Sequence, residues 1–160
     1  MNRIEAGPAH CRRAPLAAFA MVAALWLACA QAAIAHVTVT DPWVRGTVEG
    51  QTASGAYMTL ESDTAVRLTV VTSPLAARCS VHEMTMSANV MRMRALDSLP
   101  LAAGEKVQMG ERSGKHVMLE GLVRPLRAGD MVPLKLTFVD ANGQRQILQV
   151  QAPVRPLGAP

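Results

Sequence analysis

Short stretches in which apolar and polar residues alternate recur along the chain from residue 36 onwards. A period of two is typical of a β-strand with one buried face, whereas an amphipathic helix repeats at about 3.6 residues. No stretch after residue 35 has the helical period over a useful length. Turn-forming residues separate the alternating runs, which occupy 36–46, 54–60, 66–72, 79–86, 90–96, 106–109, 116–122, 132–140 and 145–153. The pattern predicts an all-β domain, either a sandwich or a barrel.

Two features near the C-terminus refine this prediction. The pair Asn142-Gly143 lies between two runs and suits a tight turn, so we expect a hairpin between Val139 and Arg145. Residues 153–160 are rich in proline and lie at the chain end, which predicts a frayed tail.

The first 35 residues have the composition of a secretory signal peptide. Arginines precede a long apolar stretch, and residues 33–35, Ala-Ile-Ala, fit the small-x-small rule for cleavage. A membrane anchor is the alternative, but Gln31 interrupts the apolar stretch beside the cleavage site. A lipid anchor on Cys29 would need a lipobox, which the preceding residues match poorly. We therefore predict a periplasmic protein without stable membrane insertion, and one mature domain over 36–160.

The mature chain carries little net charge. The full 160 residues hold 16 Lys and Arg against 12 Asp and Glu, and cleavage would remove three arginines and Glu5, leaving 13 against 11. No basic run with interleaved aromatic residues is present, so nucleic acid is not an expected partner. Cleavage would also remove Cys11 and Cys29. The remaining Cys79 then has no partner for an internal disulfide, and we expect it to pack in the core.

Methionines are concentrated in the segment 82–93, "HEMTMSANVMRM". If residues 88–89 form a two-residue turn, Ser87 pairs with Val90, and the pairing continues outwards from the turn. The remaining pairs would be Met86 with Met91, Met84 with Met93, and His82 with Ala95. Alternation then places His82 and all four methionines on one face of the hairpin. That face is either a core face filled by methionine or a face that binds something through sulfur.

A second His-x-Met pair favours the binding interpretation. In the run 116–122, Val117 and Leu119 share one face, which their apolar branched side chains mark as the core side. His116 and Met118 must lie on the opposite face, where core packing does not require them. Thioether sulfur and neutral imidazole together suit Cu(I), whereas zinc prefers thiolate, imidazole and carboxylate. Thioethers also cannot form disulfides in an oxidising compartment.

At these residues the chain resembles the periplasmic copper chaperones of the PCuAC family. The resemblance rests on "HEM" at 82–84, a methionine eleven positions after its histidine, and "HVM" at 116–118. It extends to "DPWVRGT", "GAYMTL" and "RPLRAGDMVPLKLTF". The resemblance implies a cupredoxin-like Greek-key β-sandwich that binds one Cu(I). The implied ligands are His82, Met93, His116 and Met118, with Met84 as an additional candidate.

The resemblance also implies partners. Members of the family serve assembly of the dinuclear copper centre of cytochrome c oxidase, passing copper to that subunit or to a Sco-type thioredoxin-like protein. Here we expect a monomer that is not an enzyme. Some relatives carry a His- and Met-rich C-terminal extension for a second copper, but the tail "QAPVRPLGAP" contains neither residue type.

Three alternatives compete with the chaperone interpretation. A blue-copper electron carrier needs a cysteine ligand, but alternation places Cys79 with Val81, on the face opposite His82. A copper-dependent redox enzyme could use the α-amine and imidazole of His36, which cleavage would expose, yet no second histidine pair accompanies it. The third alternative is an exported β-sandwich that binds a protein partner without metal. No acid–base dyad, nucleophile motif or phosphate loop points to catalysis.

Overall fold

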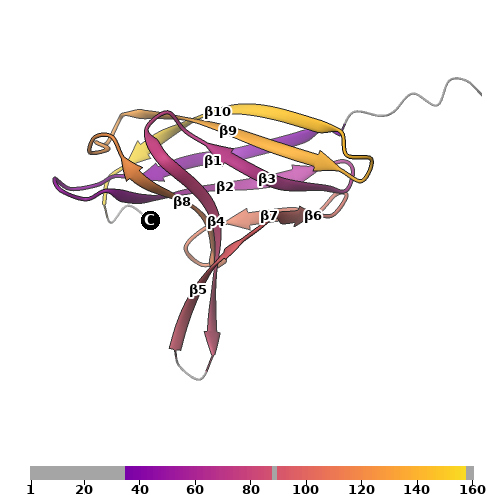
Figure 1. Cartoon of the computed structure of the whole chain (residues 1–160), viewed down its shortest axis with the longest axis horizontal. Coiled ribbons are helices and arrows are strands. Elements are labelled where there is room, and N and C mark those ends of the chain that lie inside the picture. The colour runs from indigo at the N-terminus through magenta and orange to yellow at the C-terminus, as the bar shows by residue number, and fades with distance from the viewer. Residues whose placement is uncertain (1–34, 88–89, 158–160) are drawn as a thin grey trace, which may run out of the picture. The chain divides into compact units, whose positions relative to one another are not determined.

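The computed structural model describes residues 35–87 and 90–157, and every element that it contains there is a β-strand (Figure 1). The predicted signal peptide, apart from Ala35, and the predicted turn at 88–89 lie outside the described residues. Within the described part of the chain, no helix is long and apolar enough to cross a membrane. The strands are β1 (Val37–Arg45), β2 (Ala53–Ser62), β3 (Val66–Thr72), β4 (Ala76–Ser87), β5 (Val90–Leu96), β6 (Leu99–Leu101), β7 (Lys106–Met109), β8 (Lys115–Leu122), β9 (Met131–Asp140) and β10 (Arg145–Arg155).

The strands form two layers joined along one side. The first layer has the order β5-β4-β8-β2-β1, and the second has the order β10-β9-β3-β6. A short parallel pairing of β1 with β10 connects them, and β7 pairs with β2 beyond the end of β8. Neighbours in each layer are often distant in sequence, as in a Greek key. The predicted all-β sandwich is confirmed.

The core lies between the layers because alternate residues of each strand are apolar and point inwards. In β9, the side chains of Val132, Leu134, Leu136 and Phe138 are almost completely buried, while their neighbours are more exposed. Val117 and Leu119 of β8 are fully buried, as predicted. Because Val117 and Leu119 point into the core, their alternating neighbours His116 and Met118 lie on the other face of β8.

The two C-terminal predictions had different outcomes. The hairpin after β9 is confirmed: Val139 pairs with Arg145, Gly143 has φ of 79°, and the Asp140 carboxylate accepts hydrogen bonds from the backbone of the turn. The predicted tail begins too early, because β10 continues to Arg155. Val154 is buried in the core and pairs with β1, which holds this segment in the sheet. Residues 158–160 lie outside the described residues.

Candidate metal centre

The β4–β5 hairpin carries the methionine-rich segment and has the predicted register. Met84 pairs with Met93, Met86 with Met91, and His82 with Ala95. β8 pairs with β4 only as far as Glu83, opposite Lys115. Beyond this pairing the Met84 amide still donates to Gly114, and the described backbone of the rest of the hairpin bonds only within the hairpin, which extends away from the two layers (Figure 1).

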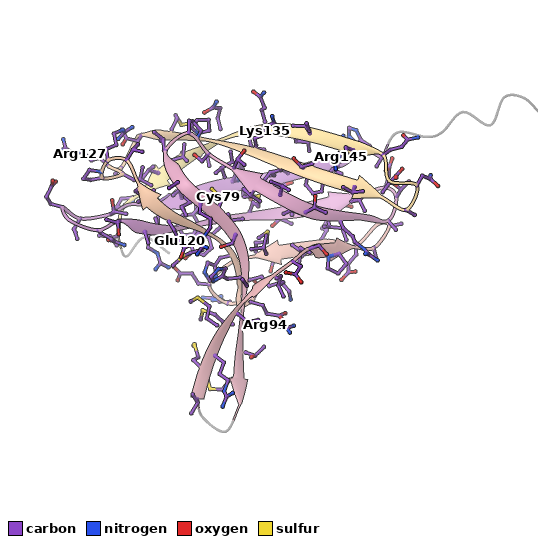
Figure 2. The ribbon with its side chains drawn as sticks, in the orientation of Figure 1. Cys79, Arg94, Glu120, Arg127, Lys135 and Arg145 are labelled. Carbon is purple, nitrogen blue, oxygen red and sulfur yellow. The ribbon has the colours of Figure 1, made fainter. Side chains whose placement is uncertain are left out.

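The methionine face of this hairpin is not a core face. Met86 is 67% exposed, Met91 is 62% exposed and Met93 is 51% exposed. Figure 2 shows sulfur atoms along the projecting hairpin, outside the sandwich. Because a methionine that fills a core is buried, the packing interpretation of these side chains is wrong. They need another explanation.

β8 brings the second His-x-Met pair beside the hairpin. His116 lies directly opposite His82 in the β4–β8 ladder, and the centroids of their rings are 5.8 Å apart. Met118 lies opposite Ser80 of β4 and Gly55 of β2. His116 is only 8% exposed, because Tyr57 approaches its ring from β2 with a centroid separation of 6.2 Å. The face opposite the core is therefore partly covered at His116 rather than open to water.

A cavity of about 390 Å³ lies at this junction. Met84, Met93, His116 and Met118 all line it, so the structure brings together residues from β4, β5 and β8. Other lining residues include Arg45, Tyr57, Glu111 and Gly114. His82 does not line the cavity and lies next to it, against His116. No group of three or more His, Cys, Asp or Glu side chains suited to a metal occurs in 35–87 or 90–157.

The ring of His82 has one satisfied nitrogen and one unsatisfied nitrogen. Its Nε2 lies 2.9 Å from Ser80 Oγ, whereas its buried Nδ1 has no hydrogen-bond partner among the described residues. A buried polar atom without a partner is costly. If Nε2–H donates to Ser80 Oγ, Nδ1 keeps a free lone pair, and a hydrogen bond of this kind commonly orients a histidine ligand. The donor set therefore fits a soft metal ion.

The charges around the cavity favour neutral donors. Burial lowers the pKa of His116 below its usual 6.5, and electrostatic interactions with His82 and Arg45 lower it further. His116 consequently remains neutral at pH 7. Arg45 forms an ion pair with Glu111 and lies over the Tyr57 ring, 5.5 Å from its centroid. Burial raises the pKa of Tyr57, so its phenol stays protonated.

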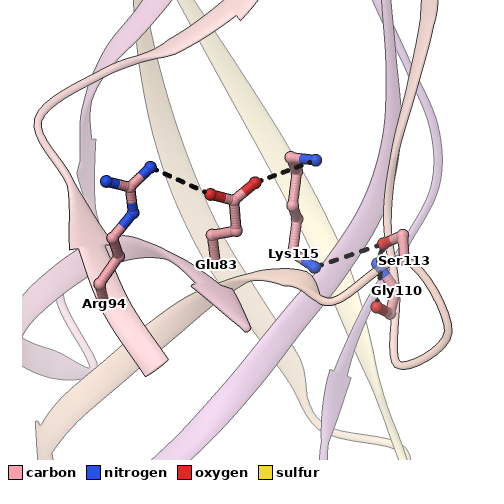
Figure 3. A network of polar contacts seen from close by, with 5 residues as sticks. All are labelled: Glu83, Arg94, Gly110, Ser113 and Lys115. Carbon is pink, nitrogen blue, oxygen red and sulfur yellow. Dashed lines mark hydrogen bonds and ion pairs between the residues drawn. The ribbon is translucent and has the colours of Figure 1, made fainter. Parts of the chain in front are cut away.

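An ion-pair network on the reverse side of the hairpin ties together the strands that carry these donors (Figure 3). Glu83 of β4 contacts both Arg94 of β5 and Lys115 of β8, each at 3.3 Å. Each member is adjacent in sequence to a candidate ligand: Glu83 follows His82, Arg94 follows Met93, and Lys115 precedes His116. These contacts lower the pKa of Glu83, Arg94 contributing most.

Gly114 allows the loop before β8 to approach β4 closely. The Met84 amide donates to the Gly114 carbonyl at 2.6 Å, and Gly114 has φ of 71°. A Cβ at Gly114 would lie 2.7 Å from the Met84 carbonyl oxygen, which leaves no room for a side chain. Ser113 stabilises the same turn by accepting from the Gly110 amide at 2.8 Å (Figure 3).

Two other sequence candidates lie away from this cavity. Cys79 packs at the edge of the core opposite Leu119, on the side of Val81 as predicted, and burial raises its pKa to about 11. His36 is exposed at the start of β1, where its amide donates to Asp63 at 2.8 Å. On β2, Ser62 lies opposite Val37, the residue after His36, and Gly55 lies opposite Met118. Ser62 and Gly55 are seven positions apart, or about 23 Å along an extended strand.

Sequence reasoning missed four residues that shape the centre. Ser80 orients His82, and Tyr57, Arg45 and Glu111 enclose the cavity. Tyr57 is the easiest to recover, because it lies in the alternating run 54–60, two positions after Gly55 and on the same face of the strand. Arg45 and Glu111 lie 66 positions apart, and their pairing has no local signal.

Comparison with solved structures defines the class of this domain. A copper-bound PCuAC domain from PmoF2 matches 75% of this chain and 92% of its own length, with a TM-score of 0.59 and 23% identity. The solution structure of CuI-DR1885 from Deinococcus radiodurans matches 82% of this chain and 85% of its own length, with a TM-score of 0.56 and 31% identity. The fold is thus that of the PCuAC domains, and the resemblance found in the sequence is confirmed.

The chain belongs to the family described as "Putative lipoprotein LpqE-like", whose model matches residues 37–154. A curated relative, "Putative lipoprotein Lxx21020" of Leifsonia xyli subsp. xyli (strain CTCB07), is 31% identical over 108 residues, or 66% of this chain. The match spans 64% of that relative's length.

Proposed function

We propose that this protein is an exported Cu(I) chaperone whose ligands are His82, Met93, His116 and Met118, with Met84 as an additional candidate. The observation that carries the proposal is the junction of β4, β5 and β8. There, two histidines lie opposite each other, and thioethers line the adjoining cavity. The buried, unpartnered Nδ1 of His82 supports it further.

Copper in the +1 state suits these donors better than zinc does. Thioether sulfur is a soft, neutral ligand, and the two imidazoles supply stronger donors without adding charge. The only thiol in the described residues is Cys79, which lies on the core side with a raised pKa. A thiolate site of the blue-copper kind has no support here. The copper is cargo in this proposal, and we infer no catalysis.

The proposal includes export to the periplasm and delivery to a respiratory acceptor. The names of the family and of the relative describe lipoproteins, which supports export. The acceptor would be the copper-centre subunit of cytochrome c oxidase or a Sco-type protein. Intact mass of the processed protein tests the first step: a chain beginning at His36 is expected, and a lipid on Cys29 would contradict the predicted cleavage.

A Cu(I) competition titration tests the binding proposal. We expect one tight Cu(I) per monomer of the mature domain and much weaker zinc binding. His116→Ala combined with Met118→Ala should abolish the tight site. Met131→Leu, which alters a half-exposed methionine on β9, is the matched control. Unchanged Cu(I) affinity in the double variant would contradict the assignment, and a wild type without Cu(I) affinity would favour a protein-interaction module.

Delivery needs a separate measurement. The Cu(I)-loaded protein is mixed with the metal-free soluble domain of each acceptor, and the two are separated and assayed for copper. Movement of copper to one of them is the expected result. Retention of all copper by the donor would contradict delivery to these acceptors while leaving the binding proposal intact.

A further inference from the structure

The outer part of the β4–β5 hairpin carries a second pair of facing methionines. Met86 lies directly opposite Met91, one same-face step beyond the Met84–Met93 pair. Same-face steps along a strand are about 6.6 Å. Both side chains are about two-thirds exposed, so the core does not account for them.

These methionines line a small cavity of their own. It has a volume of about 190 Å³, and its walls include Met84, Met86, Met91 and the loop at 111–114. We call it the outer cavity, and we call the larger cavity at the junction of β4, β5 and β8 the inner cavity. Met84 lines both. The two cavities are therefore adjacent and share one thioether.

The chemistry of the outer cavity differs from that of the inner one. Its soft donors are three thioethers, and none of the described residues that line it is a histidine or a cysteine. Glu111 and Arg112 line it as well, but the Glu111 carboxylate is already ion-paired with Arg45. Sulfur must then supply the affinity. A neutral set of thioethers selects a soft monovalent ion such as Cu(I) over zinc or magnesium.

We propose that Met84, Met86 and Met91 form a second, weaker Cu(I) site that receives the ion before it reaches the inner centre. The inference rests on the proposed function, because the inner centre is the destination. Copper would move inwards by ligand exchange, with Met84 staying bound while Met93 and His116 replace Met86 and Met91. The ion remains Cu(I) throughout. No proton is released, because the thioethers and the neutral imidazole carry none at the donor atoms.

Anaerobic Cu(I) titration of the mature chain tests this site, with ¹³C-labelled methionine methyl groups followed by NMR. Wild type should bind a second, weaker equivalent that shifts the methyl signals of Met86 and Met91. Met86→Leu combined with Met91→Leu should lose the second equivalent and retain the first. Met131→Leu, an exposed methionine outside both cavities, should retain both.

The outcomes separate the two proposals. Absence of a second equivalent, or its persistence in the Met86/Met91 double variant, would overturn the outer site while leaving the inner centre untouched. A second equivalent that appears only as the protein dimerises, measured by light scattering, would also overturn it, because the ligands would then come from two chains. The double variant His116→Ala with Met118→Ala tests the inner centre independently, because it should lose the first, tight equivalent of Cu(I).

Discussion

Replacing Met93 by leucine should separate the stability of the fold from the binding of copper. Leucine has nearly the same volume and apolarity as methionine but has no sulfur, and swaps of this kind usually cost little even in a core. Met93 is 51% exposed, so the cost should be smaller still, within about 0.5 kcal/mol. The melting temperature of the metal-free protein should therefore barely change.

The copper-bound protein should respond differently. A ligand that binds only the folded state adds about 4.1 kcal/mol to the free energy of unfolding at a thousandfold excess over its dissociation constant. If losing the Met93 sulfur lowers the affinity for Cu(I) by about a hundredfold, this increment falls by about 2.7 kcal/mol, to about 1.4 kcal/mol. For a domain of this size, 1 kcal/mol corresponds to about 4 °C. Copper should then raise the melting temperature by about 16 °C in wild type and about 6 °C in the variant.

The assay is thermal unfolding of both proteins at one buffered concentration of free Cu(I), with and without the metal. Met131→Leu serves as the control, since it is a similarly exposed methionine away from the cavity. Equal copper-induced shifts in wild type and Met93→Leu would refute the assignment of Met93 as a ligand. A large drop in the melting of the metal-free variant would refute the claim that Met93 lies outside the core.

Three further predictions follow from other parts of the site. Cys79→Ser should cost about 1 kcal/mol and keep full copper stoichiometry, and the native thiol should react slowly with alkylating reagents because its pKa is about 11; copper loss would contradict this. Glu83→Gln removes the ion pairs that join β4 to β5 and β8, so it should lower the Cu(I) affinity measured in a competition titration. Glu61→Gln, which breaks a distant exposed ion pair, should leave the affinity unchanged, and equal effects of the two variants would refute a positioning role for Glu83. Because the folded-state pKa of His116 is lowered, the unfolded chain binds its proton first, so the metal-free protein should lose stability as pH falls below about 6.5. If the melting temperature of the wild type varied with pH in the same way as that of His116→Gln, this prediction would be contradicted.

The hairpin and its pairing could be predicted because both depend on local sequence. Alternation predicts which face each residue occupies, and the assumption of a two-residue turn at 88–89 predicts which residues are opposite. The observed pairing of Met84 with Met93 follows directly. The placement of His116 opposite the core also follows from its buried neighbours Val117 and Leu119.

The enclosure of the site could not be predicted in the same way. His116 is buried because Tyr57, on a strand distant in sequence, covers it, and alternation within one strand carries no information about the neighbouring strand. The exposure of Met86 likewise depends on where β8 stops pairing with β4. The end of β10 was missed because Val154 is held by β1, at the other end of the chain.

X-ray absorption of the mature domain loaded with one equivalent of Cu(I) tests the central claim most directly. The measurement reports the elements bound to copper without depending on any variant. Nitrogen and sulfur neighbours together, from imidazole and thioether, are the predicted result. A first shell containing only nitrogen and oxygen, or no bound copper after removal of excess metal, would contradict the proposed centre.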